Sequence, residues 1–270
     1  MQHKTEYKIV FSDVDGTLLN SRHELSVHTK SAIESLQKKG IPFVIISARS
    51  PSGIYPIQKT YQFKSPIICY SGAMILDENR NVLYEKGFSR ALAKEIAAYI
   101  EENRLACVWN VYAGDTWMVK DKKDPRVIRE ETIVQAEAVE GMVDSLPERA
   151  QISKILCMCE PNRLLDIEQR LKTAFPMLSI VKSSDALLEI MQSGITKSTG
   201  VKELCKLWGI SPENAVAFGD HYNDIEMLET VGAPFLMGNA PEALKQRGFP
   251  VTDSNDKDGI YTALKKIGLI

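Results

Sequence analysis

Short apolar runs alternate with amphipathic segments in the first 70 residues of the chain. Residues 9–11, 42–46 and 67–70 are apolar runs of strand length, and residues 32–36 place Ala32, Ile33 and Leu36 at helical spacing. Apolar runs that are joined by helices are typical of parallel strands whose two faces are both covered. The pattern therefore predicts repeated strand–helix–strand units, with a second helix over residues 54–61.

The pattern changes after Gly72. Residues 74–76 and 82–84 flank a polar turn, which predicts a hairpin. From about residue 85 to residue 185, helical faces at 92–100 and 164–171 are mixed with separate strand-like runs. Those runs are 107–111, 117–119, 155–158 and 178–181.

The strand–helix rhythm then resumes, with a helical face at residues 201–208 and a strand at 215–218. The fold class predicted is α/β: a Rossmann-like parallel sheet core with an inserted α+β cap domain. The core is discontinuous and takes residues 1–84 and 186–270, and the cap takes residues 85–185. Two domains also suit a chain of 270 residues.

The amino-acid composition argues against nucleic acids and membranes as binding partners. The chain has 33 Lys and Arg against 35 Asp and Glu, so it lacks the basic field that binds nucleic acid or an anionic membrane. Residues 1–8 are polar and unlike a secretory signal, and the apolar runs are shorter than the roughly 20 residues that span a bilayer. We expect a soluble cytoplasmic protein that binds neither nucleic acid nor membrane, of unspecified oligomeric state. Its five cysteines show no Cys-x-x-Cys spacing and are expected to be buried, reduced thiols.

Polar residues gather where the predicted strands end. They are Asp13 and Asp15 after the first strand, Ser47 and Arg49 after the second, Lys197 at a helix start, and Asp220, Asn223 and Asp224 after strand 215–218. In an open parallel sheet, ligands bind at the carboxyl ends of the strands. Clustered carboxylates need a cation, and oxygen ligands suit Mg²⁺. These residues predict metal-assisted phosphoryl chemistry, with Asp13 as nucleophile and Asp15 as acid and base.

The order of these residues resembles the haloacid dehalogenase superfamily of aspartyl-phosphate hydrolases, and within it the sugar-phosphatase-like Cof branch with a large inserted cap of the C2B type. Four motifs carry the resemblance. They are Asp13-Val14-Asp15-Gly16-Thr17, Ser47, Lys197, and Gly219-Asp220-His221-Tyr222-Asn223-Asp224.

The resemblance implies a role for each matching residue. Asp13 is implied as the nucleophile and a metal ligand, Asp15 as the acid and base and a ligand through its carbonyl, and Asp220 as the third ligand of Mg²⁺. Asp224 is implied to orient Lys197 or metal-bound water. The implied phosphate-binding groups are the amides of Val14 and Ala48, the Ser47 hydroxyl, the Lys197 ammonium and the Asn223 amide.

Two positions depart from the branch. Ser47-Ala48-Arg49 stands where Thr-Gly-Arg is frequent, and Ser71-Gly72-Ala73 stands where Asn-Gly-Ala is frequent. The first change keeps a hydroxyl, whereas the second removes an amide near the leaving-group side, which weakens any transfer of substrate preference.

We therefore predict a Mg²⁺-dependent phosphatase of small phosphorylated metabolites, sugar phosphates first, whose cap moves on linkers at 72–87 and 183–197 and selects the leaving group. A phosphosugar mutase that uses the same aspartate and a non-catalytic phosphate-ligand-binding regulator are the alternatives.

Three other patterns bear on the chemistry. His23 and His28 are five residues apart, which excludes the His-Glu-x-x-His zinc motif. Residues 194–198 lack the glycines of a phosphate-binding loop. Trp109, Tyr112 and Trp117 could form an aromatic platform for a sugar, but aromatic residues in apolar strands are more often core, and two of the three are predicted to be core.

Overall fold

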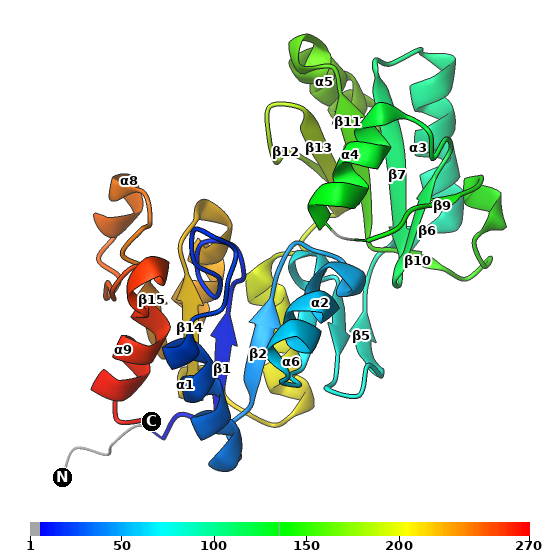
Figure 1. Cartoon of the computed structure of the whole chain (residues 1–270). Coiled ribbons are helices and arrows are strands. Elements are labelled where there is room, and N and C mark those ends of the chain that lie inside the picture. The colour runs from blue at the N-terminus through cyan, green and yellow to red at the C-terminus, as the bar shows by residue number, and fades with distance from the viewer. Residues whose placement is uncertain (1–5, 135) are drawn as a thin grey trace. The chain divides into compact units, whose positions relative to one another are not determined.

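The structure is a computed structural model that describes residues 6–134 and 136–270 (Figure 1). Its residues form two compact units. Unit 1 contains the described residues up to Ala48 together with Ile57–Tyr84 and Thr196–Ile270, and unit 2 contains Arg49–Pro56 and Glu85–Ile195. Most of unit 2 is thus a single long insertion in the sequence of unit 1.

Unit 1 is built on a seven-stranded sheet. In spatial order its strands are β15 (Ala233–Leu236), β14 (Ala215–Gly219), β1 (Ile9–Ser12), β2 (Phe43–Ile46), β3 (Ile67–Cys69), β4 (Met74–Leu76) and β5 (Val82–Glu85). From β15 to β3 neighbouring strands are parallel, and β4 is antiparallel to β3. All four residues of β1 are buried, as expected for a central strand covered on both faces.

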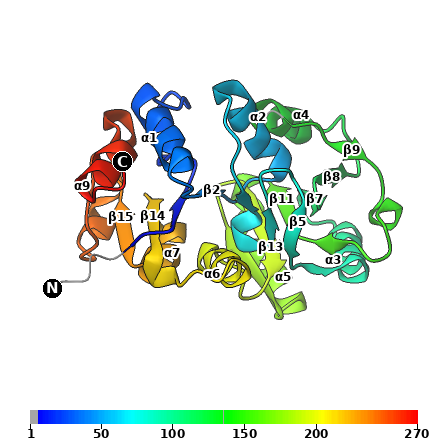
Figure 2. The same cartoon turned by 90° about the horizontal axis from the view of Figure 1, so that it is seen from below.

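Helices cover both faces of this sheet: Figure 2 shows α1 and α9 on one face and α6 and α7 on the other. The helices are α1 (Val27–Lys38), α2 (Pro51–Tyr61), α6 (Lys197–Leu207), α7 (Ile225–Thr230), α8 (Glu242–Lys245) and α9 (Gly259–Lys266). Helix α1 buries Ala32, Ile33 and Leu36, the residues that the periodicity selects. Its start is capped by the Ser26 side chain, which accepts a hydrogen bond from the Thr29 amide.

Unit 2 is built on a six-stranded, mostly antiparallel sheet. In spatial order its strands are β12 (Leu178–Lys182), β13 (Leu187–Gln192), β11 (Lys154–Cys159), β7 (Cys107–Ala113), β8 (Thr116–Val119) and β9 (Val139–Glu140). Its helices are α3 (Arg90–Glu102), α4 (Pro125–Val134) and α5 (Leu164–Ala174), and β6 (Phe88–Ser89) pairs with β10 (Gln151–Ile152). One hydrophobic core joins α3 and α5 to the sheet.

The predicted α/β fold with an inserted α+β module is confirmed, but the boundary at residues 185 and 186 needs correction. Residues 187–192 form β13, which pairs with β11 and β12 in the sheet of unit 2. The predicted linker at 183–197 therefore contains a strand, and the chain re-enters unit 1 at Thr196. The reason is packing: Leu188 and Ile190 point into the core of unit 2. Residues 49–56, predicted in the core, also group with unit 2.

The aromatic residues of unit 2 differ from expectation as well. Trp109, Tyr112 and Trp117 are buried at 3%, 6% and 2% exposure, so all three of them, and not two, belong to the core. Tyr112 and Trp117 stack with their ring centroids 5.7 Å apart, and the Trp117 indole donates to Asn110 Oδ1. The indole N–H of Trp117 and the facing surfaces of both rings are therefore engaged inside the unit.

The cysteines are free, and four of the five are buried, with Cys107 half-buried. Among residues 6–134 and 136–270, no helix combines the length and the apolar character that crossing a membrane requires.

Candidate active site

Asp13 is the first residue after β1, at the carboxyl end of the sheet of unit 1. Strand β1 lies between β14 and β2, and the Asp13 amide donates to the Phe218 carbonyl on β14 at 3.1 Å. The residue is 7% exposed. A central strand thus places one carboxylate in a nearly buried position at the sheet edge where ligands bind in such folds.

Lys197 reaches the same position from the first residue of α6. The preceding residue, Thr196, caps the helix and forms a reciprocal capping box with Thr199, which fixes the point where the helix begins. The ammonium Nζ lies 2.5 Å from Asp13 Oδ1 and 2.6 Å from Oδ1 of Asp224. Lys197 is 1% exposed, so these charge-assisted hydrogen bonds lie away from bulk water.

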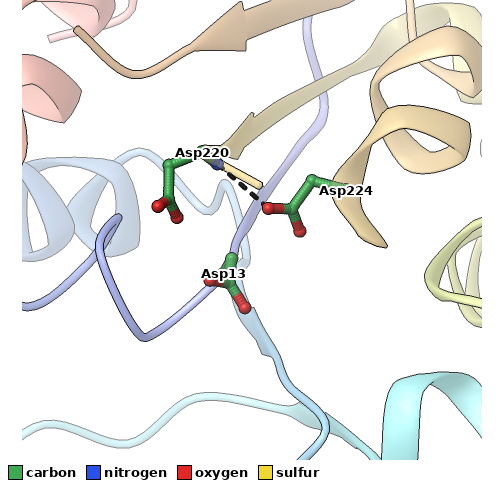
Figure 3. A group of neighbouring side chains, drawn as sticks. All are labelled: Asp13, Asp220 and Asp224. Atoms are coloured by element: carbon green, nitrogen blue, oxygen red, sulfur yellow. Dashed lines mark hydrogen bonds between the residues drawn. The ribbon is translucent and has the colours of Figure 1, made fainter. Parts of the chain in front are cut away.

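Asp220 and Asp224 come from the loop after β14. Figure 3 shows that their carboxyl groups and that of Asp13 face a common space. Asp224 is fully buried; besides binding Lys197, it accepts hydrogen bonds at Oδ2 from the amides of Asp220 and His221, each at 3.0 Å. Its carboxylate is therefore occupied in holding the lysine and closing the loop.

Burial and mutual repulsion set the charges of this cluster. Burial raises the pKa of Asp13, Lys197 lowers it, and Asp224 and Asp220 raise it, so that the net pKa is about 7. Burial also raises the pKa of Asp220. Burial opposes the charge on Lys197, but Asp13 and Asp224 outweigh this effect, so the pKa of Lys197 is raised and the ammonium stays charged.

The cluster has the character of a cation site. Asp13, Asp220 and Asp224 each offer a carboxylate oxygen, and these atoms lie within 4.8 Å of one another. Three carboxylates against one lysine leave an excess of negative charge that a hard divalent cation neutralises. The residues therefore fit a hard divalent cation such as Mg²⁺.

The backbone at Gly16 leaves space for the carboxylates of this cluster. Gly16 has φ +81°, and a Cβ there would lie 2.3 Å from Asp220 Oδ2. The next residue, Thr17, is buried and donates from Oγ1 to Asp220 Oδ1 at 2.8 Å. The loop after Asp15 thus holds the Asp220 carboxylate, a role that sequence reasoning did not assign to Thr17. The sequence feature that could have indicated this role is the position of Thr17, a polar residue two positions after Asp15 in the acidic loop.

The other predicted residues lie at the same edge of unit 1. Val14 is buried directly after Asp13, and Asp15 is exposed. Ser47 is 2% exposed at the end of β2, and its amide donates to the Ile68 carbonyl; Ala48 follows it half-buried. Asn223 lies exposed in the turn that leads to Asp224. The hydrogen bonds described above join Asp13, Lys197, Asp220 and Asp224, and the phosphate-binding roles stay predictions.

The turn after β3 has an unusual backbone. Tyr70, Ser71 and Gly72 have φ values of 50°, 54° and 115°, all in the left-handed range. The Ser71 amide donates to the Ser47 carbonyl at 2.9 Å, and a Cβ at Gly72 would lie 2.3 Å from the Thr196 carbonyl. This turn therefore contacts Ser47 at the end of β2 and Thr196, which directly precedes Lys197 at the start of α6.

The sequence profile of the haloacid dehalogenase-like hydrolases matches residues 10–264. The chain belongs to this family. A Haemophilus influenzae protein named "Putative phosphatase" is 37% identical over 260 residues, which cover 96% of this chain and 98% of that protein.

Solved structures of this family have the same fold. A haloacid dehalogenase-like hydrolase from Bacteroides thetaiotaomicron superposes with a TM-score of 0.87 at 26% identity, over 97% of this chain and all of that one. A sugar phosphatase of subclass IIB superposes with a TM-score of 0.79 at 23% identity, over 97% of this chain and 100% of that one. The predicted family and the predicted class of enzyme, a hydrolase, are confirmed.

Proposed function

We propose that this hydrolase cleaves phosphate monoesters of small metabolites, sugar phosphates first, in a Mg²⁺-dependent reaction through an aspartyl-phosphate. The observation that carries the proposal is the buried Asp13 carboxylate, bonded to Lys197 and facing Asp220. A buried carboxylate that lies beside an ammonium and a candidate cation site has what an attack on a phosphoryl anion requires.

In the first step, a carboxylate oxygen of Asp13 attacks phosphorus, the bond from phosphorus to the leaving oxygen breaks, and the Asp15 carboxyl group donates its proton to that oxygen. In the second step, the Asp15 carboxylate takes a proton from water, the water oxygen attacks phosphorus, and the bond to Asp13 breaks. Phosphate and free Asp13 result. Asp15 suits a group that exchanges protons with substrate and water because it is exposed.

Charge neutralisation explains the other roles that we assign. A bound Mg²⁺, held by Asp13, Asp220 and the Asp15 carbonyl, would offset the charge of the carboxylates and of the phosphoryl oxygens. Lys197 adds a second positive charge, and Asp224 fixes its ammonium at 2.6 Å. The amides of Val14 and Ala48, the Ser47 hydroxyl and the Asn223 amide are proposed to bind the phosphoryl oxygens.

The substrate class rests on the names of relatives. The Haemophilus influenzae relative is named as a phosphatase, and the subclass IIB structure is that of a sugar phosphatase. We assign the choice of leaving group to unit 2, in the role of a cap, because most of it is one insertion between the segments of unit 1 and it contains none of the four site motifs.

The test is hydrolysis of p-nitrophenyl phosphate by the wild type and by Asp13→Asn, each with Mg²⁺ and with a chelator. We expect turnover only in the wild type with Mg²⁺. Asp185→Asn is the matched control, because that side chain is 94% exposed and lies in unit 2, and it is expected to keep the wild-type rate. An Asp13→Asn variant that hydrolyses the ester at the wild-type rate would refute the proposal.

The same preparation separates the alternatives. A mutase returns the phosphoryl group to an added sugar phosphate instead of releasing phosphate, so product analysis identifies it. A regulator binds Mg²⁺ and inorganic phosphate but shows no turnover across a panel of phosphate esters.

A further inference from the structure

Asn239 connects three segments of unit 1 that are distant in sequence. Its Nδ2 donates to the Gly16 carbonyl at 2.8 Å and lies 3.5 Å from Asp220 Oδ2. Its Oδ1 accepts a hydrogen bond from the main-chain amide of Asn255 at 3.0 Å. One side chain thus contacts the loop after Asp15, the loop after β14 and the carboxyl-terminal segment.

These partners fix the orientation of the amide. The Asn255 main-chain N–H needs an acceptor and the Gly16 carbonyl needs a donor, so the oxygen and nitrogen of Asn239 cannot be exchanged. Because the amide is planar and one N–H is bonded to Gly16, the second N–H is directed towards Asp220 Oδ2, in a contact longer than a strong hydrogen bond.

Asp220 is thereby held from two sides. Thr17 donates to Oδ1 at 2.8 Å, and Asn239 faces Oδ2. Gly16 contributes to both contacts, because its carbonyl holds Asn239 and its missing Cβ leaves space for the carboxylate. A neutral donor in this place orients a carboxylate without supplying the charge that would compete with a cation.

We propose that Asn239 is a positioning residue for the cation site: it fixes the Asp220 carboxylate against the loop that carries Asp13 and Asp15. This inference rests on the proposed function, because it gives Asp220 the role of a Mg²⁺ ligand. Groups that orient metal ligands through hydrogen bonds change metal affinity by roughly 10- to 100-fold when they are removed.

The experiment measures Mg²⁺ binding by calorimetry, without substrate, for the wild type, Asn239→Ala and Asn239→Leu. We expect both variants to bind Mg²⁺ at least about tenfold more weakly. The leucine keeps the volume of the side chain without its hydrogen bonds, so it covers the case in which the alanine variant does not fold. In p-nitrophenyl phosphate hydrolysis, the Mg²⁺ concentration for half activation should rise, while KM at saturating Mg²⁺ stays near the wild-type value.

Asn255→Ala is the matched control. The Asn255 side chain donates to the Leu19 carbonyl at 2.9 Å on the same loop, but its bond to Asn239 comes from the main chain and survives the substitution. This variant should keep the Mg²⁺ affinity of the wild type.

Three results overturn the inference. A wild type that binds no Mg²⁺ removes the proposed function and the inference with it. A wild type that binds, together with an Asn239→Leu variant of equal affinity, removes the inference alone. An equal loss of affinity in Asn255→Ala assigns the effect to the loop as a whole and not to Asp220.

Discussion

Among residues 6–134 and 136–270, each unit contains one buried lysine that is bonded to a carboxylate, and the two lysines differ in their surroundings. In unit 2, Lys154 is 7% exposed, lies 3.3 Å from Glu189 Oε1 and has its Nζ 5.3 Å from the centre of the Tyr112 ring. In unit 1, Lys197 is 1% exposed and bonds to both Asp13 and Asp224, with Asp220 beside them.

The difference lies in the balance of charge. Lys154 is hydrogen-bonded to Glu189 and faces the Tyr112 ring, and the neighbouring charges of Glu130 and Arg129 are opposite in sign, an arrangement that balances a buried ammonium inside a sheet. Lys197 has two bonded carboxylates and a third nearby, so the cluster keeps excess negative charge and the pKa of Asp13 is raised to about 7. A buried ion pair by itself therefore indicates little, whereas a buried excess of one charge indicates a binding site for a ligand of the other sign.

The largest expected effect is a difference in kcat between two variants, in each of which one of the buried lysines is replaced by methionine. Lys197→Met should lower kcat for p-nitrophenyl phosphate by roughly 100- to 1000-fold, because it removes a donor that stabilises charge in the transition state. Lys154→Met should leave kcat near the wild-type value, since its contacts lie within unit 2. Equal losses in the two variants, with both proteins folded by circular dichroism, would contradict the comparison.

Asp13→Asn is expected to stabilise the protein when metal is absent and the pH is high. The pKa of Asp13 is about 7 in the folded protein against 3.8 as the ordinary value, so the folded state favours the proton. The stability that this preference contributes is complete below pH 3.8 and is lost as the pH rises through about 7. At pH 8 the variant avoids a cost on the order of a few kcal/mol.

Calorimetric melting in a chelator checks this prediction. The difference in melting temperature between Asp13→Asn and the wild type should grow from pH 5 to pH 8 and shrink when Mg²⁺ is added at pH 8. A difference that stays constant across this range would show that Asp13 does not titrate as described.

Two glycines give a smaller and more local contrast. Gly16→Ala should weaken Mg²⁺ binding by roughly 10- to 100-fold, because the new Cβ would lie 2.3 Å from Asp220 Oδ2. Gly114 has φ +56°, and a Cβ there would have no atom within 4 Å, so Gly114→Ala should cost only about 1–2 kcal/mol of stability. Titration calorimetry of both variants distinguishes crowding of the site from backbone strain.

The smallest effect concerns the Lys154–Glu189 pair. Lys154→Met and Glu189→Gln should each lower the free energy of unfolding, and the double variant should lose less than their sum, with a coupling of about 1 kcal/mol. Urea unfolding of the four proteins measures this coupling. Additive losses would mean that Lys154 and Glu189 contribute independently to stability and that their ion pair has no coupling energy.

The sequence pattern predicted those elements whose signals are local. Strands β1 and β2 are continuous apolar runs, and α6 begins at the lysine that follows a capping threonine. Strand β13 was missed because its short apolar run lies between the polar residues 183–185 and the turn residues 193–194, so the whole segment resembled a linker.

The sequence predicted which residues belong to the site but not the hydrogen bonds that join its loops. The resemblance selected Asp13, Lys197 and Asp220 by motif. The bond between Thr17 and Asp220 joins residues 203 positions apart, and Asn239 contacts Gly16 across 223 positions. Such pairs depend on which loops the sheet order brings together, and neither composition nor periodicity encodes that order directly.

The left-handed backbone conformation at residues 70–72 limits which residue types are tolerated at these three positions. Non-glycine residues pay a conformational cost in this range, and asparagine tolerates it better than serine. If these three codons were randomised, selection for thermal stability alone should enrich asparagine or glycine at Ser71 and retain Gly72. Selection for turnover should diverge from that outcome wherever the reaction needs the serine. The distance between the two enriched populations would measure how much of this turn is maintained for the fold and how much for the substrate.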